Sequence, residues 1–524
     1  MHGPKSSTPR ARATSRGSAS LLILLLLAGS LLVAGASRGQ DESAAQRLMQ
    51  EAERQLANGN LVGAIAEYEA LVTRFPDSRA APRALQRWAN AQYTAGDART
   101  AYDLADRLAS QYPASPQAAE AMILQARIQL VNANDRPAIE QAATLLRRIP
   151  NLFGPESYPS LEARTEARVL TGQISMQLGD LADAAYEFLQ AIEVETDSPW
   201  SSAARVGLAR VLLFAETRSE TDLASAIQLL QEALDAGSGD PALIPAVTAD
   251  AAAEARTLLT TVHRLLIRPV SGGSPWRQAG LLPGVRGKKP QAVATAGDGR
   301  IAVIDDGTLI IQSPDGVIQT LGELRNPGRP WFGDGQLYVP LQDSVRQIPG
   351  NAGRSFYYDG PKPKELDKLA AGAQGQLGEW WLYDRSIDGV VVFDRMAHKT
   401  LGLAPAGGIN VTDVAAGPLG KVVVLSAKDS RVLVIGPDRR TLGGFTGSWR
   451  RPDAIATDQL GNVYVLDRGS NQIDVRTMGG TKIATLGPLL PGGLELKSPE
   501  DLAVDAFGRV LIIDSKLEGP VVVE

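Results

Sequence analysis

Residues 452–467 read PDAIATDQLGNVYVLD, and residues 499–514 read PEDLAVDAFGRVLIID. The two stretches share their proline, aspartate and glycine positions at a constant separation of 47 residues. Apolar residues alternate with polar ones in both, and Gly and Asp punctuate the alternation, which is typical of short β-strands joined by tight turns. The pair therefore predicts a repeated β unit.

The glycine of this unit recurs towards the N-terminus at intervals of 36 to 47 residues, as Gly299, Gly335, Gly378, Gly420, Gly461 and Gly508. Six units of about 40 residues, each with several short strands, predict a six-bladed β-propeller over residues 276–524. We expect each glycine in the hairpin between the first two strands, where the backbone needs a positive φ. We assign a turn role, accepting backbone N–H groups, to Asp305, Asp384, Asp467 and Asp514.

The two ends of this region predict how the ring closes. The last unit stops after three strands, at 521–523, and residues 276–281 (WRQAGL) resemble 482–487 (KIATLG), the fourth strand of the unit before it. We predict that the N-terminal strand completes the last blade, which leaves no long exposed edge.

Residues 452–475, PDAIATDQLGNVYVLDRGSNQIDV, resemble an NHL repeat. The resemblance is strong in the last two units and weaker over 290–434. It implies a propeller that offers binding surfaces to proteins, glycans or RNA. Some propellers of this kind are enzymes, among them histidine-dependent lyases and calcium-dependent lactonases.

A different period organises residues 41–268. Small residues, leucines and prolines recur every 37 residues in four registers: Ala52, Ala89 and Ala126; Ala64, Ala101 and Ala138; Leu71, Leu108 and Leu145; Pro76, Pro113 and Pro150. Each unit predicts two helices that cross closely at the small residues, with the proline ending the second helix. A fourth unit, a looser fifth and a closing helix at Ala246–Ile267 complete a solenoid, and residues 269–275 read as a linker.

Gly59, Ala64, Tyr68, Leu71 and Pro76 follow the residue order of a tetratricopeptide repeat. The period departs from the usual length of about 34 residues, and the usual Trp and Tyr of the first helix are missing. The segments 75–78 (FPDS) and 112–115 (YPAS) resemble repeats of the bacterial outer-membrane-assembly lipoprotein and of the Tol–Pal-associated periplasmic protein. The resemblance implies an envelope scaffold that binds other envelope proteins or peptides through a concave face lined by the first helices.

Residues 1–36 predict a secretory signal peptide. A basic stretch precedes a 13-residue apolar run at 21–33, and 34–36 (AGA) supplies a small-residue cleavage site. An uncleaved N-terminal anchor is the alternative, although a membrane span needs about 20 apolar residues. We expect an exported protein, periplasmic or extracellular, of a bacterial envelope, because the chain has no Cys for disulfides. The missing Cys also means that the chain is not itself a lipoprotein.

Charge further limits the partners. Removing residues 1–36 changes the net charge from −5 to −9, which disfavours nucleic acid. Residues 37–268 carry 21 Arg, no Lys and 30 acidic residues. This acidic region has two possible interpretations, a groove that binds basic or extended partners and a surface that is merely solvated. Residues 269–524 balance 28 basic against 28 acidic residues, which also argues against RNA.

Composition argues against catalysis. The chain has no Cys, three His and no P-loop, G-x-S-x-G or H-E-x-x-H motif. We therefore predict a protein that is not an enzyme, with no catalytic, cofactor-binding or metal-binding residue, and we assign no catalytic role to His263 or His398.

Two residue pairs are candidates for partner binding. Trp380 and Trp381 lie in a predicted strand, so one ring should face outwards, where it can stack on a sugar or a partner side chain. The alternative is that they pack between blades. Arg450 and Arg451 form a basic pair in a predicted loop.

These observations predict an exported, two-domain scaffold made of a helical solenoid and a propeller. A propeller that senses glycans or small ligands is one alternative, and it requires an aromatic and polar cluster at one mouth of the ring. A metal-assisted hydrolase or lactonase is another, and it requires carboxylates that converge in the central tunnel.

Overall fold

The structure is a computed structural model that describes residues 40–133, 136–158, 161–194, 198–214, 219–270, 274–350, 353–405 and 408–524. The predicted signal peptide and part of the predicted linker lie outside these residues. The chain forms two compact units, of which one ends at Ile128 and the other runs from Gln129 to Glu524. None of the helices in the described ranges combines the length and the apolarity that a membrane span requires.

The first unit consists of antiparallel helical hairpins. Its helices are 40–57, α2 (Leu61–Arg74), α3 (Ala81–Thr94), α4 (Ala98–Gln111) and the beginning of α5 (Pro116–Asn132). The repeat shows in the turns, because the side chains of Asn60 and Asp97, 37 residues apart, both cap the following helix. Of the small residues predicted at helix crossings, five are buried and Ala138 is half-buried; the buried ones are Ala52, Ala64, Ala89, Ala101 and Ala126.

The prolines of the repeat do not all end a helix. Helices α2 and α4 end just before Pro76 and Pro113, as predicted, but Pro150 lies inside α6 (Arg136–Leu152). The prediction is wrong for Pro150 because a proline in the last turn removes only one backbone hydrogen bond, which a long helix tolerates.

In the second unit the hairpins continue through α12. Its helices after α6 are α7 (Glu162–Gln177), α8 (Leu181–Val194), α9 (Trp200–Phe214), α10 (Glu220–Ala236) and α11 (Ala246–Val262), then the π-helix η1 (His263–Ile267) and α12 (Arg268–Val270). Leu258, Val262 and Leu265 of the closing helix share a core cluster with α10. Helices α11 and η1 thus occupy the residues predicted for a closing helix.

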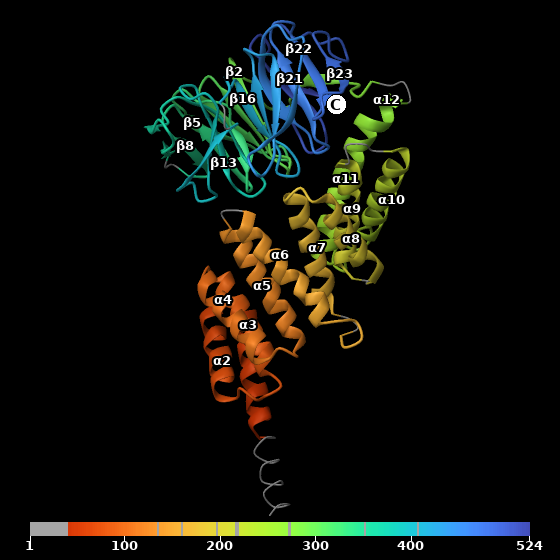
Figure 1. The fold of residues 1–524 in the computed structure, drawn as a ribbon, viewed down its shortest axis with the longest axis vertical. Helices are drawn as coiled ribbons and strands as arrows, with labels where there is room; N and C mark the ends of the chain where they lie inside the picture. The colour runs from red at the N-terminus through yellow and green to blue at the C-terminus, as the bar shows by residue number, and fades with distance from the viewer. Residues whose placement is uncertain are drawn as a thin grey trace, which may run out of the picture. The chain divides into compact units, whose positions relative to one another are not determined.

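A six-bladed β-propeller follows, with one four-stranded antiparallel sheet per blade (Figure 1). Blades one to three contain β2 (Pro290–Thr295), β3 (Ile301–Asp305), β4 (Thr308–Gln312) and β5 (Ile318–Glu323); β6 (Trp331–Gly333), β7 (Gln336–Pro340), β8 (Val345–Ile348) and β9 (Gly353–Arg354); and β12 (Leu369–Gln374), β13 (Trp380–Asp384), β14 (Val390–Phe393) and β15 (Thr400–Ala404). A short hairpin, β10 (Tyr357–Tyr358) and β11 (Lys364–Glu365), separates blades two and three.

The remaining three blades repeat the pattern. They contain β16 (Asp413–Ala416), β17 (Val422–Ser426), β18 (Arg431–Ile435) and β19 (Thr441–Thr446); β20 (Pro452–Thr457), β21 (Asn462–Asp467), β22 (Gln472–Thr477) and β23 (Lys482–Leu486); and β24 (Pro499–Val504), β25 (Val510–Asp514), β26 (Val521–Val523) and β1 (Ala279–Leu281). All six predicted glycines have positive φ, between 65° and 89°.

The last blade closes the ring as the sequence predicts. Strand β1 pairs antiparallel with β26, so that Ala279 lies opposite Val523 and Leu281 opposite Val521. Just before β1, Trp276 is buried, and its ring meets that of Tyr464 edge-on at 6.3 Å between centroids. The N-terminal strand is thereby fixed to blades five and six.

The turn aspartates are hydrogen-bonded as predicted. Asp467 accepts the backbone N–H groups of Arg450, Arg451 and Gly469 at 3.1, 2.6 and 3.1 Å, and the hydroxyl of Ser470 at 2.7 Å. These bonds join the loop before a blade's first strand to the turn after its second strand. The aspartate is therefore a structural link within one blade.

Replacing Asp467 by Ala is expected to lower the free energy of unfolding of the propeller by about 1–3 kcal/mol, because several backbone donors lose their acceptor. Thermal unfolding followed by tryptophan fluorescence measures the change. Asp315→Ala is the matched control, because the exposed Asp315 accepts one backbone N–H at 3.3 Å. Equal shifts for the two variants would show that Asp467 is not a structural link.

Candidate functional site in the propeller channel

The central channel of the propeller is lined by the first strand of each blade. These strands are β2, β6, β12, β16, β20 and β24; neighbours contact one another in blade order, and β24 contacts β2. Asp413 and Asp501 pair with Leu425 and Ile513 on the second strands of their blades. Residues at the same level in three other blades are alanines: Ala292, Ala371 and Ala454. Two carboxylates thus stand in an otherwise apolar layer of the channel.

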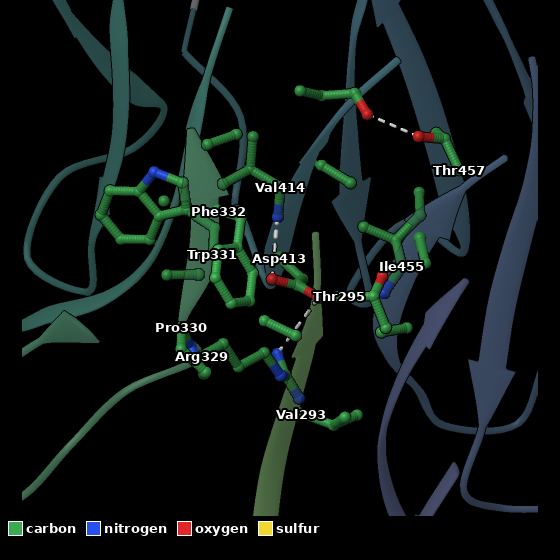
Figure 2. A pocket seen from close by; sticks show the side chains of 18 of the residues that line it. Val293, Thr295, Arg329, Pro330, Trp331, Phe332, Asp413, Val414, Ile455 and Thr457 are labelled. Atoms are coloured by element: carbon green, nitrogen blue, oxygen red, sulfur yellow. Dashed lines mark hydrogen bonds and ion pairs between the residues drawn. The ribbon is translucent and has the colours of Figure 1, made fainter. Parts of the chain in front are cut away.

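Arg329 crosses the channel to reach these carboxylates. It precedes β6 in blade two, and its Nη1 lies 3.5 Å from Asp413 of blade four. Its Nη2 lies 2.9 Å from Asp453 of blade five, and its Nε lies 3.0 Å from Asp501 of blade six. Figure 2 shows the Arg329 guanidinium and the Asp413 carboxylate joined across this pocket. One guanidinium therefore ties blade two to three blades on the other side of the ring.

The same carboxylates also bind the backbone of the next blade. Asp413 accepts the N–H of Ile455 at 2.9 Å, and Asp501 accepts the N–H of Val293 at 2.9 Å. Each of these bonds crosses a boundary between blades. The bond from Val293 to Asp501 joins the first blade to the last and adds to the closure made by β1.

A second guanidinium lies on one side of Arg329. Arg468 follows β21, and its Nη1 and Nη2 lie 3.4 Å from Asp453 and 3.4 Å from Glu500. Arg329 and Arg468 thus share Asp453, and the cluster holds two guanidiniums against four carboxylates. We call these six residues the channel cluster: Arg329, Asp413, Asp453, Arg468, Glu500 and Asp501.

Burial and charge act in opposite directions on the ionisation of this cluster. Burial, together with the neighbouring charge of Asp413, raises the pKa of Asp501 to about 7 against the attraction of Arg329. Burial likewise raises the pKa of Asp413, although Arg329 and two backbone N–H groups favour its charged form. Burial opposes the charge of Arg329, but the three carboxylates outweigh it and raise the pKa of Arg329.

The channel brings carboxylates together, as the hydrolase alternative requires, but a guanidinium lies between them. No cluster of three or more His, Asp or Glu suited to a metal ion is present in the ranges that the structure describes. Because Arg329 contacts Asp413, Asp453 and Asp501 at once, their charges are used in an ion-pair network. The arrangement can hold the blades together and present charge at the mouth of the channel.

The tryptophan pair is buried. Trp381 is fully inaccessible, and Trp380 is 7% exposed. Each indole N–H has an internal acceptor, the carbonyl of Arg395 for Trp380 and the carboxylate of Glu379 for Trp381. The expectation that one ring faces outwards is wrong, because both sides of β13 face packed residues, and the alternative of packing inside the propeller applies.

The arginine pair and the two histidines discussed in the sequence analysis lie at the surface. Arg450 and Arg451 are exposed, and their backbone N–H groups belong to the Asp467 turn. His263 at the end of α11 and His398 in the turn between β14 and β15 are also exposed. The structure brings none of these four side chains together with the channel cluster.

Arg329, Asp413 and Asp501 form the centre of the channel cluster, and the sequence did not predict them. A signal for the two aspartates was present, because an acidic residue stands at a strand position where other blades carry alanine. Arg329 had no such signal. It lies in the least regular blade, and its partners are 84 to 172 residues away in the sequence.

Residues 41–168 match the protein-family model described as YfiO: Outer membrane lipoprotein. The match falls on the helical hairpins and covers none of the propeller. No curated protein matches the chain.

Solved structures resemble each half of the chain separately. A streptogramin B lyase structure covers 47% of this chain and 96% of its own, at 11% identity and a TM-score of 0.35. The WD40 propeller domain of Doa1 covers 47% and 96%, at 11% identity and a TM-score of 0.35. A thermophilic tetratricopeptide-repeat protein from Thermus thermophilus covers 40% and 98%, at 19% identity and a TM-score of 0.29.

At these identities the likenesses concern the fold alone, and no activity follows from them. The predicted combination of envelope-type helical repeats and a six-bladed propeller is confirmed. The chain joins helical hairpins similar to those of the YfiO type of outer membrane lipoprotein to a six-bladed β-propeller.

Proposed function

We propose that this protein is an exported scaffold of the bacterial envelope that binds other envelope proteins or peptides and catalyses no reaction. The observation that carries the proposal is the match of residues 41–168 to the outer membrane lipoprotein family model. Helical repeats of this kind expose a continuous surface that suits protein recognition. The sequence has no Cys, so we propose export without a lipid on an N-terminal cysteine.

The channel cluster supports the non-catalytic part of the proposal. A general acid or base must be free to exchange a proton with a substrate, and a metal site needs carboxylates free to bind the ion. Here Asp413 and Asp501 each contact Arg329 and a backbone N–H of the next blade. Their geometry suits a structural role.

We assign partner binding to the surface formed by the first helices of the hairpins. Arg83 of α3 pairs with Glu53 of helix 40–57 at 2.7 Å, and Gln86 of α3 donates to Glu120 of α5. These links place the first helices side by side. We define the first-helix face as these four linked residues together with Arg87 and Asn90, which are exposed and lie one and two turns beyond Arg83 on α3.

Affinity purification after crosslinking in cells tests this assignment. We expect the full chain to retain a discrete envelope protein, and Arg87→Glu to reduce its recovery by about tenfold, which corresponds to about 1.4 kcal/mol of binding free energy. Arg87 is exposed, so the substitution should leave folding unchanged.

The matched control is Arg99→Glu, which makes the same charge change on the exposed surface of the second helix α4. We expect this variant to recover the partner as the unmodified chain does. Equal recovery by the two variants, or no stable partner for the unmodified chain, would overturn the proposal.

The basic pair on the propeller is a second surface to test. Arg450→Ala and Arg451→Ala remove both exposed side chains while keeping the backbone N–H groups that bind Asp467. If the propeller contributes to partner binding there, the double variant lowers recovery without a change in the thermal unfolding of the propeller. Unchanged recovery would remove this pair from the interface.

A further inference from the structure

One mouth of the propeller channel is a cavity of about 480 Å³ that ends at Arg329. Its polar lining residues come from blades one, three, four, five and six: Gln291, Tyr383, Arg385, Thr412, Asp453, Arg468 and Glu500. The volume lies in the range of sites that hold small ligands, about 300–1,000 Å³. The scaffold proposal does not use this cavity.

The two arginines at the mouth differ in their surroundings. Arg468 and Arg385 each directly follow the turn aspartate of their blade, Asp467 and Asp384. Arg468 pairs with two carboxylates, whereas no ion pair involves Arg385 among the described residues, and Arg385 is exposed. Blade three therefore presents a guanidinium that can bind an anionic group.

The opposite side of the mouth has an excess of negative charge. Asp453 and Glu500 have 25% and 31% of their side chains exposed, and they share Arg468. Arg329 is already engaged by Asp413 and Asp501 as well as by Asp453. With blades in contact in ring order, blade six, which carries Glu500, lies across the channel from blade three.

We propose that this mouth binds a zwitterionic ligand, a short peptide with free amino and carboxyl ends. The carboxylate would bind Arg385, and the ammonium group would bind Glu500 and Asp453. The side chains of Gln291, Thr412 and Tyr383 line the space between them and can bind peptide groups. A purely anionic ligand would meet the acidic side unpaired, and a purely cationic one would meet Arg385.

Isothermal titration calorimetry of the full chain with tri-alanine tests the proposal. We expect saturable binding, weakened about tenfold or more both by N-acetylation and by C-terminal amidation of the peptide. Arg385→Gln should weaken tri-alanine to a similar extent and make C-terminal amidation harmless. Glu500→Gln should also weaken the binding of tri-alanine, and in this variant N-acetylation of the peptide should have no further effect.

Arg440→Gln is the control, because Arg440 is a highly exposed arginine in the turn before β19 of blade four. It should bind every peptide as the unmodified chain does, and the thermal unfolding of all three variants should match. No saturable binding of tri-alanine in the millimolar range would overturn the proposal. Equal affinity of the unmodified chain for free and capped peptides would overturn it as well. So would a result in which N-acetylation and C-terminal amidation weaken peptide binding to Arg385→Gln equally. None of these results would affect the scaffold proposal, which rests on the first-helix face.

Discussion

Replacing Arg329 by Met is expected to lower the free energy of unfolding of the propeller by about 3–5 kcal/mol at pH 8, because it leaves buried carboxylates without their cation. Asp413 and Asp501 are 3% and 2% exposed, so water cannot take the place of the guanidinium. The substitution also removes the contacts from blade two to blades four, five and six. Because protonation relieves the unpaired charges, we expect a smaller loss at pH 5.

Urea unfolding followed by tryptophan fluorescence measures this effect, since Trp276, Trp331, Trp380, Trp381 and Trp449 lie in or beside the blades. Arg440→Met is the control, and its effect should stay within about 0.5 kcal/mol, because the side chain is 86% exposed. A similar small effect for Arg329→Met, or the same loss at both pH values, would contradict the assignment of Arg329 as the central cation of the channel.

Replacing Asp501 by Asn is expected to stabilise the propeller at pH 8 and to leave it nearly unchanged at pH 4. The folded-state pKa of Asp501 is raised from 3.8 to about 7, mainly by burial. The stability contributed by its protonated form is therefore complete below about pH 4 and is lost as the pH rises through 7. A rise in pKa from 3.8 to about 7 corresponds to a change on the order of 4 kcal/mol.

Urea unfolding of the unmodified chain and of Asp501→Asn at several pH values measures this effect. The groups that face Asp501 are Arg329, Asp413 and the backbone N–H groups of Val293 and Leu502, and all of them are present in both proteins. We subtract the unfolding free energy of Asp501→Asn from that of the unmodified chain. We expect this difference to be near zero at pH 4, to become more negative up to about pH 7 and to level off above pH 8. A difference that is constant with pH, or that rises, would show that Asp501 is ionised throughout this range in the folded protein.

The repeats made most of the fold predictable. The six glycines of the hairpins repeat because every blade needs the same turn, and the periodicity made that need visible in one sequence. The closure of the ring could be predicted because the strand count of the last unit was short by one. The 37-residue period predicted the helical hairpins in the same way. It was wrong in the third unit, where the helix runs on for two residues past Pro150 and Ile139 and Leu146 are buried in place of Ala138 and Leu145.

The channel cluster was not predictable, because its members come from several different blades. The position of Arg329 becomes informative only when the ring brings blade two opposite blade five. The prediction that one of the rings of Trp380 and Trp381 faces outwards was wrong for a related reason. Alternation along a strand predicts one inward and one outward ring, but blades stack on both faces of a propeller sheet, so both rings are covered. Local patterns specify the strands, whereas the meeting of six blades specifies the site.

Site-specific photo-crosslinking in cells tests the scaffold proposal most directly. A photo-reactive amino acid is placed at Asn90 on the first-helix face and, in a second strain, at Val62, which is 79% exposed on the second helix α2. We predict that light produces a discrete adduct with an envelope protein from position 90 and none from position 62. The absence of any protein adduct at position 90, or the same adducts from both positions, would contradict the proposal.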